Sequence, residues 1–250
     1  MKTKKIIVAG PLVKVAIYPR GNGRDSQKTR AAKRKLSSEA QQRLNAKYRK
    51  DKLELELAAN MLPKDHWCTF TFRNEDLPKD EKGVEAAFKA CRRLLSKAYG
   101  KQMPVIYWRA EHKHESDDFR SDRRWHIHAC IQARSGTDYE TIRSCWRYGW
   151  VDIEPIQIDK DHSYAQLAAY MVKEPLDRPG AHAWHNTRNA KKPEVETFPV
   201  PDDTTLQAPK GTLICEDWHD RNEYGFAQYL KYVEIRGLHP KGRPRAKRRR

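Results

Sequence analysis

The sequence predicts an α+β protein with an antiparallel sheet. Short stretches in which apolar and polar residues alternate, as in strands with one buried face, are interleaved with longer stretches that have the repeat of amphipathic helices. The alternating stretches at 105–111 and 125–131 are joined by a loop, and strands joined in this way are usually antiparallel neighbours. The 250 residues suffice for one sizeable domain with extensions, or for two small domains.

The charge of the chain is strongly basic and unevenly distributed. Lys and Arg number 50 against 33 Asp and Glu, a net charge of +17 that indicates a polyanionic partner, nucleic acid before membrane. Residues 1–50 hold 15 basic and two acidic residues, and 236–250 hold eight basic residues and no acid. Residues 51–235 hold 27 basic and 31 acidic residues. We therefore expect a near-neutral body whose basic ends hold phosphates, although solvated tails are the plainer reading of such charge runs.

The five cysteines are odd in number and include no C-x-x-C pair, which favours a reducing compartment over a disulfide framework or a zinc ribbon. The apolar run near the N-terminus is interrupted by Pro11 and Lys14 and lacks the features of a signal peptide. No stretch approaches the length of a transmembrane helix. We expect a cytoplasmic protein without a membrane partner.

The predicted organisation has three parts: a basic N-terminal extension (1–60), a main domain (61–235) and a basic, disordered tail (236–250). The extension begins with one or two short strands within residues 5–18. A helix follows from about residue 37 to 60.

Either Ser37 or Ser38 can cap this first helix. One side of the helix carries a rough apolar stripe of Leu44, Tyr48, Leu53 and Leu57. An ordinary amphipathic helix accounts for this pattern better than a helix that reads DNA.

The main domain opens with a strand at 67–72, where strict alternation gives one apolar face. Residues 80–98 have apolar positions at helical spacing, and Gly100 ends this helix. Thr137 to Glu140 has the spacing of a capping box that opens a helix reaching about Trp146. Residues 150–156 alternate again and predict a strand.

The strand at 125–131 is the most informative part of the sequence. Successive side chains of a strand point to opposite faces, so His126 and His128 share one face. Two neutral imidazoles held by one strand supply half of a metal coordination sphere. So short a motif is also common as the polar face of a strand. The other face is apolar and consists of Trp125, Ile127, Ala129 and Ile131.

A third metal ligand is expected from the neighbouring strand. Glu111 lies near the end of that strand and could supply a carboxylate to the two imidazoles. Asp152 and Glu154 are rival ligands if their strand lies beside the histidines, with surface solvation as the favoured role. His112 and His114 are expected in an exposed loop.

A short helix is predicted from about residue 163 to 172. It contains Tyr164 and Tyr170, which are separated by about 120° around the helix axis and so do not point at one spot. Tyr170 and Lys173 are three residues apart and share a face. If one tyrosine acts as a nucleophile, we expect it to be Tyr170, while Tyr164 packs.

These residue types together suit phosphodiester chemistry. Two His and one carboxylate leave coordination positions open, and a divalent ion there would polarise a non-bridging oxygen and offset developing charge. A phenol attacks poorly unless a nearby cation favours its ionised form, and Lys173 could supply that bias. The product would be a phosphotyrosine link and a free hydroxyl, which keeps the bond energy for rejoining.

Three motifs in this order resemble those of the HUH endonucleases: the apolar strand 67–72, then His126-Ile-His128, then Tyr170-Met-Val-Lys173. More narrowly, the chain resembles single-tyrosine rolling-circle replication initiators of phages, plasmids and integrated bacterial elements, similar to the gene II-type replication-associated proteins. The resemblance extends over about residues 37–233. Its further stretches are 36–45, 148–155 and 187–193.

The resemblance implies an antiparallel sheet of about five strands with helices packed on it, and a divalent cation, Mg²⁺ or Mn²⁺. It assigns His126, His128 and Glu111 as metal ligands, Tyr170 as the nucleophile and Lys173 as its auxiliary cation.

The implied activity is strand-specific nicking of single-stranded or extruded origin DNA by the domain at 61–235. The enzyme would stay on the 5′ phosphate and leave a 3′ hydroxyl for a polymerase of a bacterial host. No G-x-x-x-x-G-K-[ST] loop occurs in the chain, so unwinding would come from a host helicase. A non-catalytic DNA-binding protein on the same fold, and a relaxase or single-tyrosine transposase with the same chemistry, are the alternatives.

Basic residues outside the three motifs are candidates for phosphate contacts. Solvated segments would explain these residues equally well. The candidates are Arg188, Lys191, Lys192, Arg245, Lys247 and Arg248.

Overall fold

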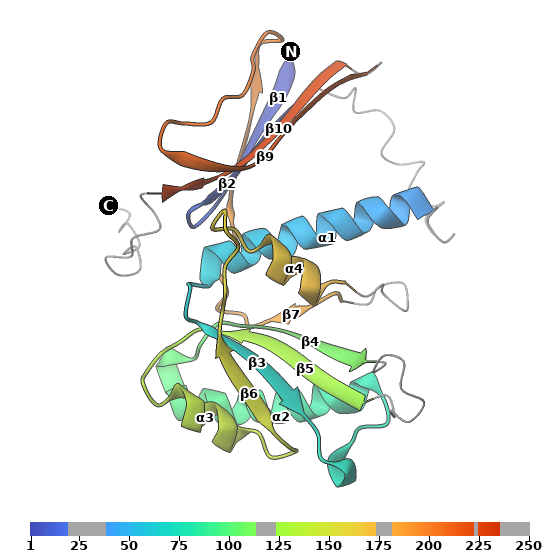
Figure 1. Ribbon diagram of the computed structural model, residues 1–250, viewed down its shortest axis with the longest axis vertical. Helices are drawn as coiled ribbons and strands as arrows, with labels where there is room; N and C mark the ends of the chain where they lie inside the picture. Colours follow the sequence, from blue (N-terminus) through green and yellow to red (C-terminus); the bar gives the residue numbers. More distant parts are fainter. Residues whose placement is uncertain (20–38, 114–123, 174–181, 223–224, 236–250) are drawn as a thin grey trace. The chain divides into compact units, whose positions relative to one another are not determined.

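The computed structural model describes residues 1–19, 39–113, 124–173, 182–222 and 225–235 (Figure 1). The described residues form two antiparallel five-stranded sheets and four α-helices, which confirms the predicted α+β class. Two compact units share the chain. Unit 1 consists of Met1–Ala59, Ile158–Gln166 and Lys191–Arg250, and unit 2 consists of Asn60–Gln157 and Leu167–Ala190.

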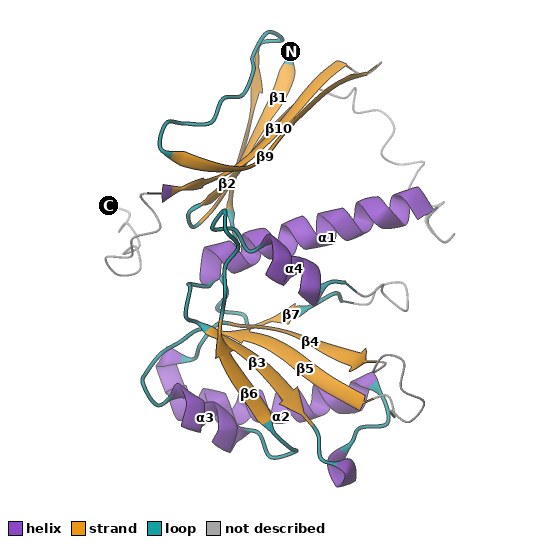
Figure 2. Cartoon of the chain, viewed as in Figure 1, coloured by secondary structure: helices purple, strands orange, loops and turns teal. Residues whose placement is uncertain are grey.

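Unit 2 contains the sheet that the sequence predicts. Its strand order is β6-β3-β5-β4-β7, and all neighbours are antiparallel. Helices α2 (Glu81–Tyr99) and α3 (Asp138–Cys145) lie against one face of this sheet (Figure 2). The strands are β3 (His66–Thr71), β4 (Ile106–Lys113), β5 (Arg124–Ile131), β6 (Val151–Pro155) and β7 (His185–Asn186).

Helix α2 follows the prediction at both ends. The side chain of Asp80 accepts a hydrogen bond from the backbone N–H of Gly83 at 2.8 Å, which satisfies one of the free donors of the first turn. Gly100, with φ +53°, ends the helix. The apolar stripe of α2, which includes Val84 and Phe88, is buried against the sheet.

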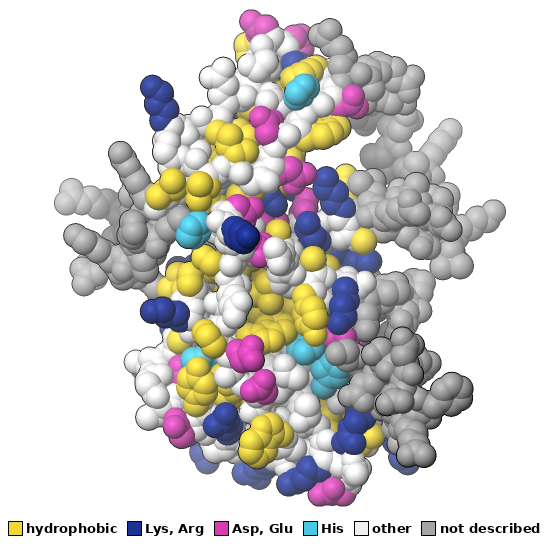
Figure 3. Space-filling model, in the orientation of Figure 1, with side chains coloured by type: hydrophobic (Ala, Val, Ile, Leu, Met, Phe, Trp, Pro, Cys, Tyr) yellow, Lys and Arg dark blue, Asp and Glu magenta, His cyan; other side chains and the backbone are white. Residues whose placement is uncertain are grey.

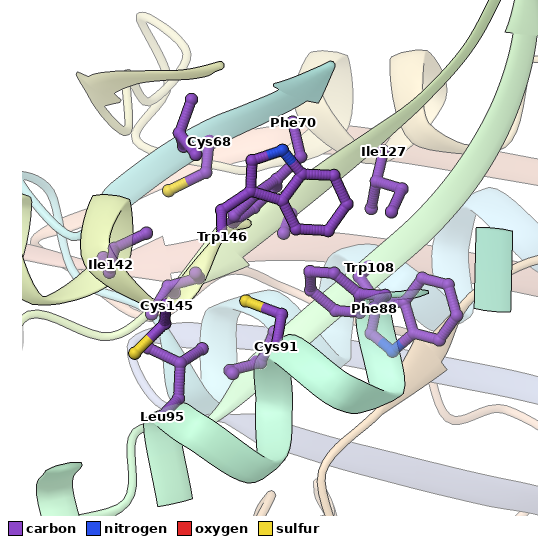
Figure 4. Packing of buried hydrophobic residues seen from close by; sticks show 14 of the residues in the cluster. Cys68, Phe70, Phe88, Cys91, Leu95, Trp108, Ile127, Ile142, Cys145 and Trp146 are labelled. Atoms are coloured by element: carbon purple, nitrogen blue, oxygen red, sulfur yellow. The ribbon is translucent and has the colours of Figure 1, made fainter. Parts of the chain in front are cut away.

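The core of unit 2 lies between the sheet and these two helices (Figure 4). Alternate residues of β3 and β5, such as Phe70 and Ile127, point into it and are fully buried. The Phe70 ring centroid lies 5.1 Å from that of Trp146. Burying one such side chain stabilises a fold by roughly 1.5–3 kcal/mol. Because one face of β3 and β5 is committed to this core, their intervening residues face the other side of the sheet.

The start of α3 differs from the prediction. The capping box expected at 137–140 is absent, since the Thr side chain makes no capping hydrogen bond. The carboxylate of Asp138 organises the turn instead. It accepts hydrogen bonds from the backbone N–H of Arg134 at 2.6 Å and from the hydroxyl of Tyr99 at 2.7 Å, and it lies 3.0 Å from Nε2 of His66. The capping-box prediction was wrong, and two of the partners of Asp138, Tyr99 and His66, are too distant in sequence for a local pattern to reveal.

Unit 1 contains a second sheet, of order β8-β1-β2-β10-β9. The predicted strands within 5–18 form the β1–β2 hairpin, but the three later strands were not predicted. Strand β8 shows why, since six of its seven residues are exposed and leave no clear alternation. The strands are β1 (Lys2–Ala9), β2 (Leu12–Pro19), β8 (Glu194–Val200), β9 (Thr212–Asn222) and β10 (Gly225–Glu234).

Helix α1 (Glu39–Asn60) confirms the predicted first helix. Leu53 and Leu57 are buried as expected, whereas Tyr48 is exposed and does not belong to the stripe. Nζ of Lys231 on β10 lies 3.0 Å from each carboxylate oxygen of Glu54, and this buried ion pair joins the helix to the second sheet. The predicted capping serines and the side chain of Leu44 lie outside the described residues.

Helix α4 (Ala165–Met171) begins in unit 1 and continues into unit 2. The division into an extension, a main domain and a tail stays a prediction. Among the described residues, no helix combines the length and apolar character needed to cross a membrane.

Candidate metal centre and its tyrosine

The sheet face opposite α2 and α3 brings the predicted site residues together. In the register of β4 and β5, Glu111 pairs with His126 and Arg109 pairs with His128. On the other side of β5, Thr69 of β3 pairs with His128. Because side chains at paired positions share a face, these five side chains lie on one side of the sheet.

Glu111, His126 and His128 form a cluster whose ligand atoms all lie within 4.8 Å of one another and which could hold a metal ion. Nε2 of His126 lies 3.6 Å from Oε2 of Glu111, and Nε2 of His128 lies 3.1 Å from the same oxygen. Glu111 and His128 are buried and His126 is half-buried. The sequence therefore identified a set of residues that the fold does bring together.

The carboxylate of Glu111 is held in its charged form. Burial opposes ionisation, but hydrogen bonds from His126, His128 and Lys173 outweigh it and hold the pKa of Glu111 well below its usual range. Nζ of Lys173 lies 2.7 Å from Oε1. The buried negative charge of Glu111 is thus paired with Lys173, and a bound cation would share it.

His128 is held in its neutral form. Burial lowers the pKa of His128 below its usual value, although the contact with Glu111 works in the opposite direction, and the neighbouring His126 lowers it further. Neutral imidazole is the form that binds metals. The electrostatics of both residues therefore suit a cation site.

Neighbours of the cluster fix the His128 ring. Oγ1 of Thr69 lies 3.2 Å from Nδ1 of His128. The ring of Trp67 stacks on the imidazole with centroids 5.0 Å apart and an interplanar angle of 13°. Such outer contacts orient a ligating histidine and select its tautomer. Sequence reasoning missed both roles, because the register of β3 against β5 is not visible in either strand alone.

Tyr170 on α4 reaches the cluster. Its hydroxyl oxygen lies 3.2 Å from Nε2 of His128, and its side chain is 39% exposed. Nζ of Lys173 lies 4.1 Å from the centroid of the Tyr170 ring. Tyr164 is 4% exposed, as expected for a tyrosine that packs.

The end of α4 is tied to the same sheet face. The guanidinium of Arg109 donates a hydrogen bond to the carbonyl oxygen of Met171 at 2.9 Å. Sγ of Cys130 lies 3.8 Å from the sulfur of Met171. Arg109 and Cys130 therefore help to position the helix that carries Tyr170, and sequence reasoning did not identify either residue.

Four further residues were considered in the sequence analysis: His112, His114, Asp152 and Glu154. His112 was expected in an exposed loop, but β4 continues to Lys113 and the His112 ring stacks on Trp125 with centroids 4.4 Å apart. Asp152 and Glu154 are exposed on β6, which β3 separates from the histidine strand. Neither acid belongs to the cluster. His114 lies outside the described residues.

Three of the six candidate phosphate-binding residues belong to the described part of the chain. Arg188, Lys191 and Lys192 are exposed. The three candidates of the tail lie outside the described residues: Arg245, Lys247 and Arg248.

The residues of the cluster fit a divalent cation. The two imidazole nitrogens suit first-row transition-metal ions, and the carboxylate oxygen suits Mn²⁺ and Mg²⁺. The negative charge of Glu111 would be shared between the cation and Lys173, and the neutral His128 adds no repulsion.

One comparison with known proteins gives a match. Residues 65–175 match the family model of the replication-associated proteins of the ORF2 and gene II type. The matched segment contains the cluster of Glu111, His126 and His128, and it also contains Tyr170 and Lys173. No curated protein and no solved structure gives a significant match. The match supports a role in replication initiation, and with it DNA binding.

Proposed function

We propose that this protein initiates rolling-circle replication by nicking one strand of single-stranded or extruded origin DNA with Tyr170. The observation that carries the proposal is the 3.2 Å separation between the Tyr170 hydroxyl oxygen and Nε2 of His128, one of the three residues that could hold a cation. A nuclease that uses water as its nucleophile would not need a phenol at this place.

The proposed reaction transfers one phosphodiester bond. The hydroxyl oxygen of Tyr170 attacks the phosphorus and loses its proton, the bond from phosphorus to the 3′ oxygen breaks, and that oxygen takes up a proton. The products are a 5′-phosphotyrosine and a 3′ hydroxyl that a host polymerase can extend, with unwinding by a host helicase. Attack by a 3′ hydroxyl on the phosphotyrosine reverses the step and rejoins DNA.

The side chains of the site have separate tasks in this reaction. Glu111, His126 and His128 would hold the cation, Mn²⁺ or Mg²⁺. When bound, it supplies Lewis-acid polarisation of a non-bridging phosphate oxygen. Lys173 lies against both the Glu111 carboxylate and the Tyr170 ring, so its positive charge would offset the negative charge that develops as the phenol attacks.

The basic segments would hold the phosphates of the substrate. Their contribution is electrostatic and independent of sequence, so it retains the DNA without selecting the nicked bond. The proposed cellular setting is the cytoplasm of a bacterial host. The proposed contacts are Arg188, Lys191, Lys192, Arg245, Lys247 and Arg248.

The test is formation of a covalent adduct. Labelled single-stranded oligonucleotides that tile the protein's own replicon are incubated with it and Mn²⁺, and the products are separated under denaturing conditions. Wild type should form an adduct, and Tyr170→Phe should form none. The matched control is Tyr164→Phe, which removes the phenol hydroxyl six residues earlier and should form the adduct normally.

A second variant separates chemistry from binding. His126→Ala should abolish the adduct and leave salt-dependent DNA retention intact, because it removes a metal ligand and no phosphate contact. Absence of an adduct with wild type, or a normal adduct with Tyr170→Phe, would show that the nucleophile assignment is wrong. Retention of DNA without any adduct would favour a non-catalytic DNA-binding protein.

A further inference from the structure

We infer that the exposed face of β6 reads the bases of the single-stranded DNA beside the scissile phosphate. Trp150, directly before β6, would stack on one base, and Asp152 and Glu154 would accept hydrogen bonds from exocyclic amino groups. The inference rests on the proposed nicking function and adds the surface that selects the substrate.

Trp150 belongs to the same row of the sheet as the metal cluster. The carbonyl oxygen of Trp150 accepts hydrogen bonds from the backbone N–H of Thr71 at 2.9 Å and from its hydroxyl at 3.3 Å, which continues the register of β6 and β3 by one residue. Thr71 pairs with His126, and His126 pairs with Glu111. With strands about 4.8 Å apart, the backbones of Trp150 and His126 are about 10 Å apart and their side chains belong to one face.

The backbone of Trp150 is fixed although its side chain is 72% exposed. A Cβ on the preceding Gly149 would clash with the carbonyl oxygen of Thr71, so only glycine allows this close approach. The N–H of Arg73 donates to the carbonyl oxygen of Tyr148 at 2.8 Å. A solvent-exposed aromatic ring on a well-fixed backbone is a suitable surface for a base to stack on.

The exposed residues of β6 on this face of the sheet are acidic. Asp152 and Glu154 alternate with the buried Val151 and Ile153, so both acids lie on the same face as Trp150. Carboxylates repel phosphates, but they accept hydrogen bonds from base amino groups such as N4 of cytosine.

Lys173, an exposed cation, contacts Glu111 of β4 and therefore lies on the other side of the histidine strand from β6. A single strand of DNA with a phosphate toward Lys173 would turn its bases toward β6. This arrangement favours single-stranded DNA over a duplex, whose bases are already paired.

The first test measures affinity without cleavage. Full-length protein in EDTA is titrated into fluorescent oligo-dC, oligo-dA and oligo-dT of equal length, and anisotropy gives each Kd. Trp150→Ala should weaken binding of all three by about tenfold, and Trp150→Phe should restore most of the affinity. The matched control is Trp218→Ala on β9, since Trp218 is 49% exposed and should not matter.

Thermal melting confirms that each variant is folded. An unchanged affinity of Trp150→Ala, or a loss no larger than that of Trp218→Ala, would overturn the inference.

The second test separates base reading from simple repulsion. If Asp152 only repels phosphates, Asp152→Ala strengthens binding of oligo-dC and oligo-dT equally, which counts against the inference. If Asp152 reads bases, loss of its acceptor oxygens lowers the preference for dC over dT by about fivefold, because thymine has no exocyclic amino group. The matched control is Glu140→Ala, which removes an exposed acid on α3 and should leave the preference unchanged.

These binding tests fail independently of the nicking proposal. If DNA binding depends on Trp150 but no covalent adduct forms, the nicking proposal is wrong and the base-reading proposal stands. If wild type forms an adduct but Trp150→Ala binds DNA as wild type does, only the base-reading proposal is wrong.

Discussion

At the scale of single residues, the candidate metal centre depends on side chains that would not touch the cation. Thr69 contacts Nδ1 of His128, and Nε2 of the same ring faces Glu111. If Nδ1 donates its hydrogen to the Thr69 hydroxyl, Nε2 carries none and is free to bind a cation. In that tautomer Nε2 does not donate to Glu111, so the Thr69 hydroxyl would favour the ring form that binds a cation over the form that donates to the carboxylate.

Replacing Thr69 tests this role. Thr69→Val keeps the shape of the side chain and removes the hydroxyl, so we expect Mn²⁺ affinity to fall about tenfold without a change in fold. Calorimetric titration of the metal-free, full-length protein measures the affinity. Thr71→Val, one step along the same face of β3, is the control and should bind Mn²⁺ like wild type. An equal affinity of Thr69→Val and wild type would contradict the role.

The ligand set could be predicted because its members are close in sequence or lie on adjoining strands. Alternation places His126 and His128 on one face, and the connecting loop places Glu111 beside them. The contribution of Thr69 depends on a strand more than fifty residues earlier, and no local pattern gives its register against β5. His112 was misplaced for a smaller reason, since β4 extends two residues beyond the predicted end.

At the scale of elements, Asp138 fixes the start of α3. It is fully buried. Burial alone would raise its pKa, but hydrogen bonds from the Arg134 N–H, His66 and Tyr99 outweigh burial and lower the pKa of Asp138 to about 2. A folded-state pKa below the unfolded value means that the charged carboxylate stabilises the fold above about pH 4, and that this stabilisation is lost as the pH falls towards 2.

Asp138→Asn should therefore destabilise the protein in a pH-dependent way. We expect a loss of about 2 kcal/mol at pH 7, and a difference from wild type that shrinks as the pH is lowered below 4. Urea unfolding at a series of pH values measures it. Asp152→Asn, at an exposed position, should change stability by less than about 0.5 kcal/mol. A difference that stays constant from pH 7 to pH 3 would contradict this account.

The elements that the sequence predicted correctly are those with one clearly buried face. The strict alternation of β3 and the apolar stripe of α2 correspond to a continuous core (Figure 4). Strands β8 and β9 were missed because charged and exposed residues interrupt their apolar positions. The pairing of β8 also depends on β1, from the other end of the chain, which a local pattern cannot contain.

At the scale of the whole molecule, the excess of basic residues lies in segments of the sequence other than the one that contains the candidate site. Lys and Arg side chains of the described residues are interspersed with Asp and Glu in Figure 3. Of the 50 basic residues, eight belong to the last fifteen positions, where no acid occurs. The tail should therefore contribute to affinity and not to the choice of the nicked bond.

Replacing the eight basic residues of 236–250 by Gln tests this separation. The salt dependence of single-stranded DNA binding should become shallower, by up to about 6 units in the slope of log K against log salt. Adduct formation at low salt should persist, because the candidate site lies elsewhere in the sequence. Filter binding at several salt concentrations gives the slope. An unchanged slope would show that the tail does not touch phosphates.

The second sheet has a consequence for the order of folding during synthesis. Strands β1 and β2 come from the first nineteen residues, but their other partners, β8 and β10, are made only after residue 193. The strands of the other sheet from β3 to β6 are all complete by residue 155 and can pair much earlier. Until translation passes β10, one edge of β2 has no partner, and an unpaired edge readily joins a strand of another chain. A ribosome that stops before residue 225 would therefore release a protein with an intact histidine strand and a tendency to aggregate.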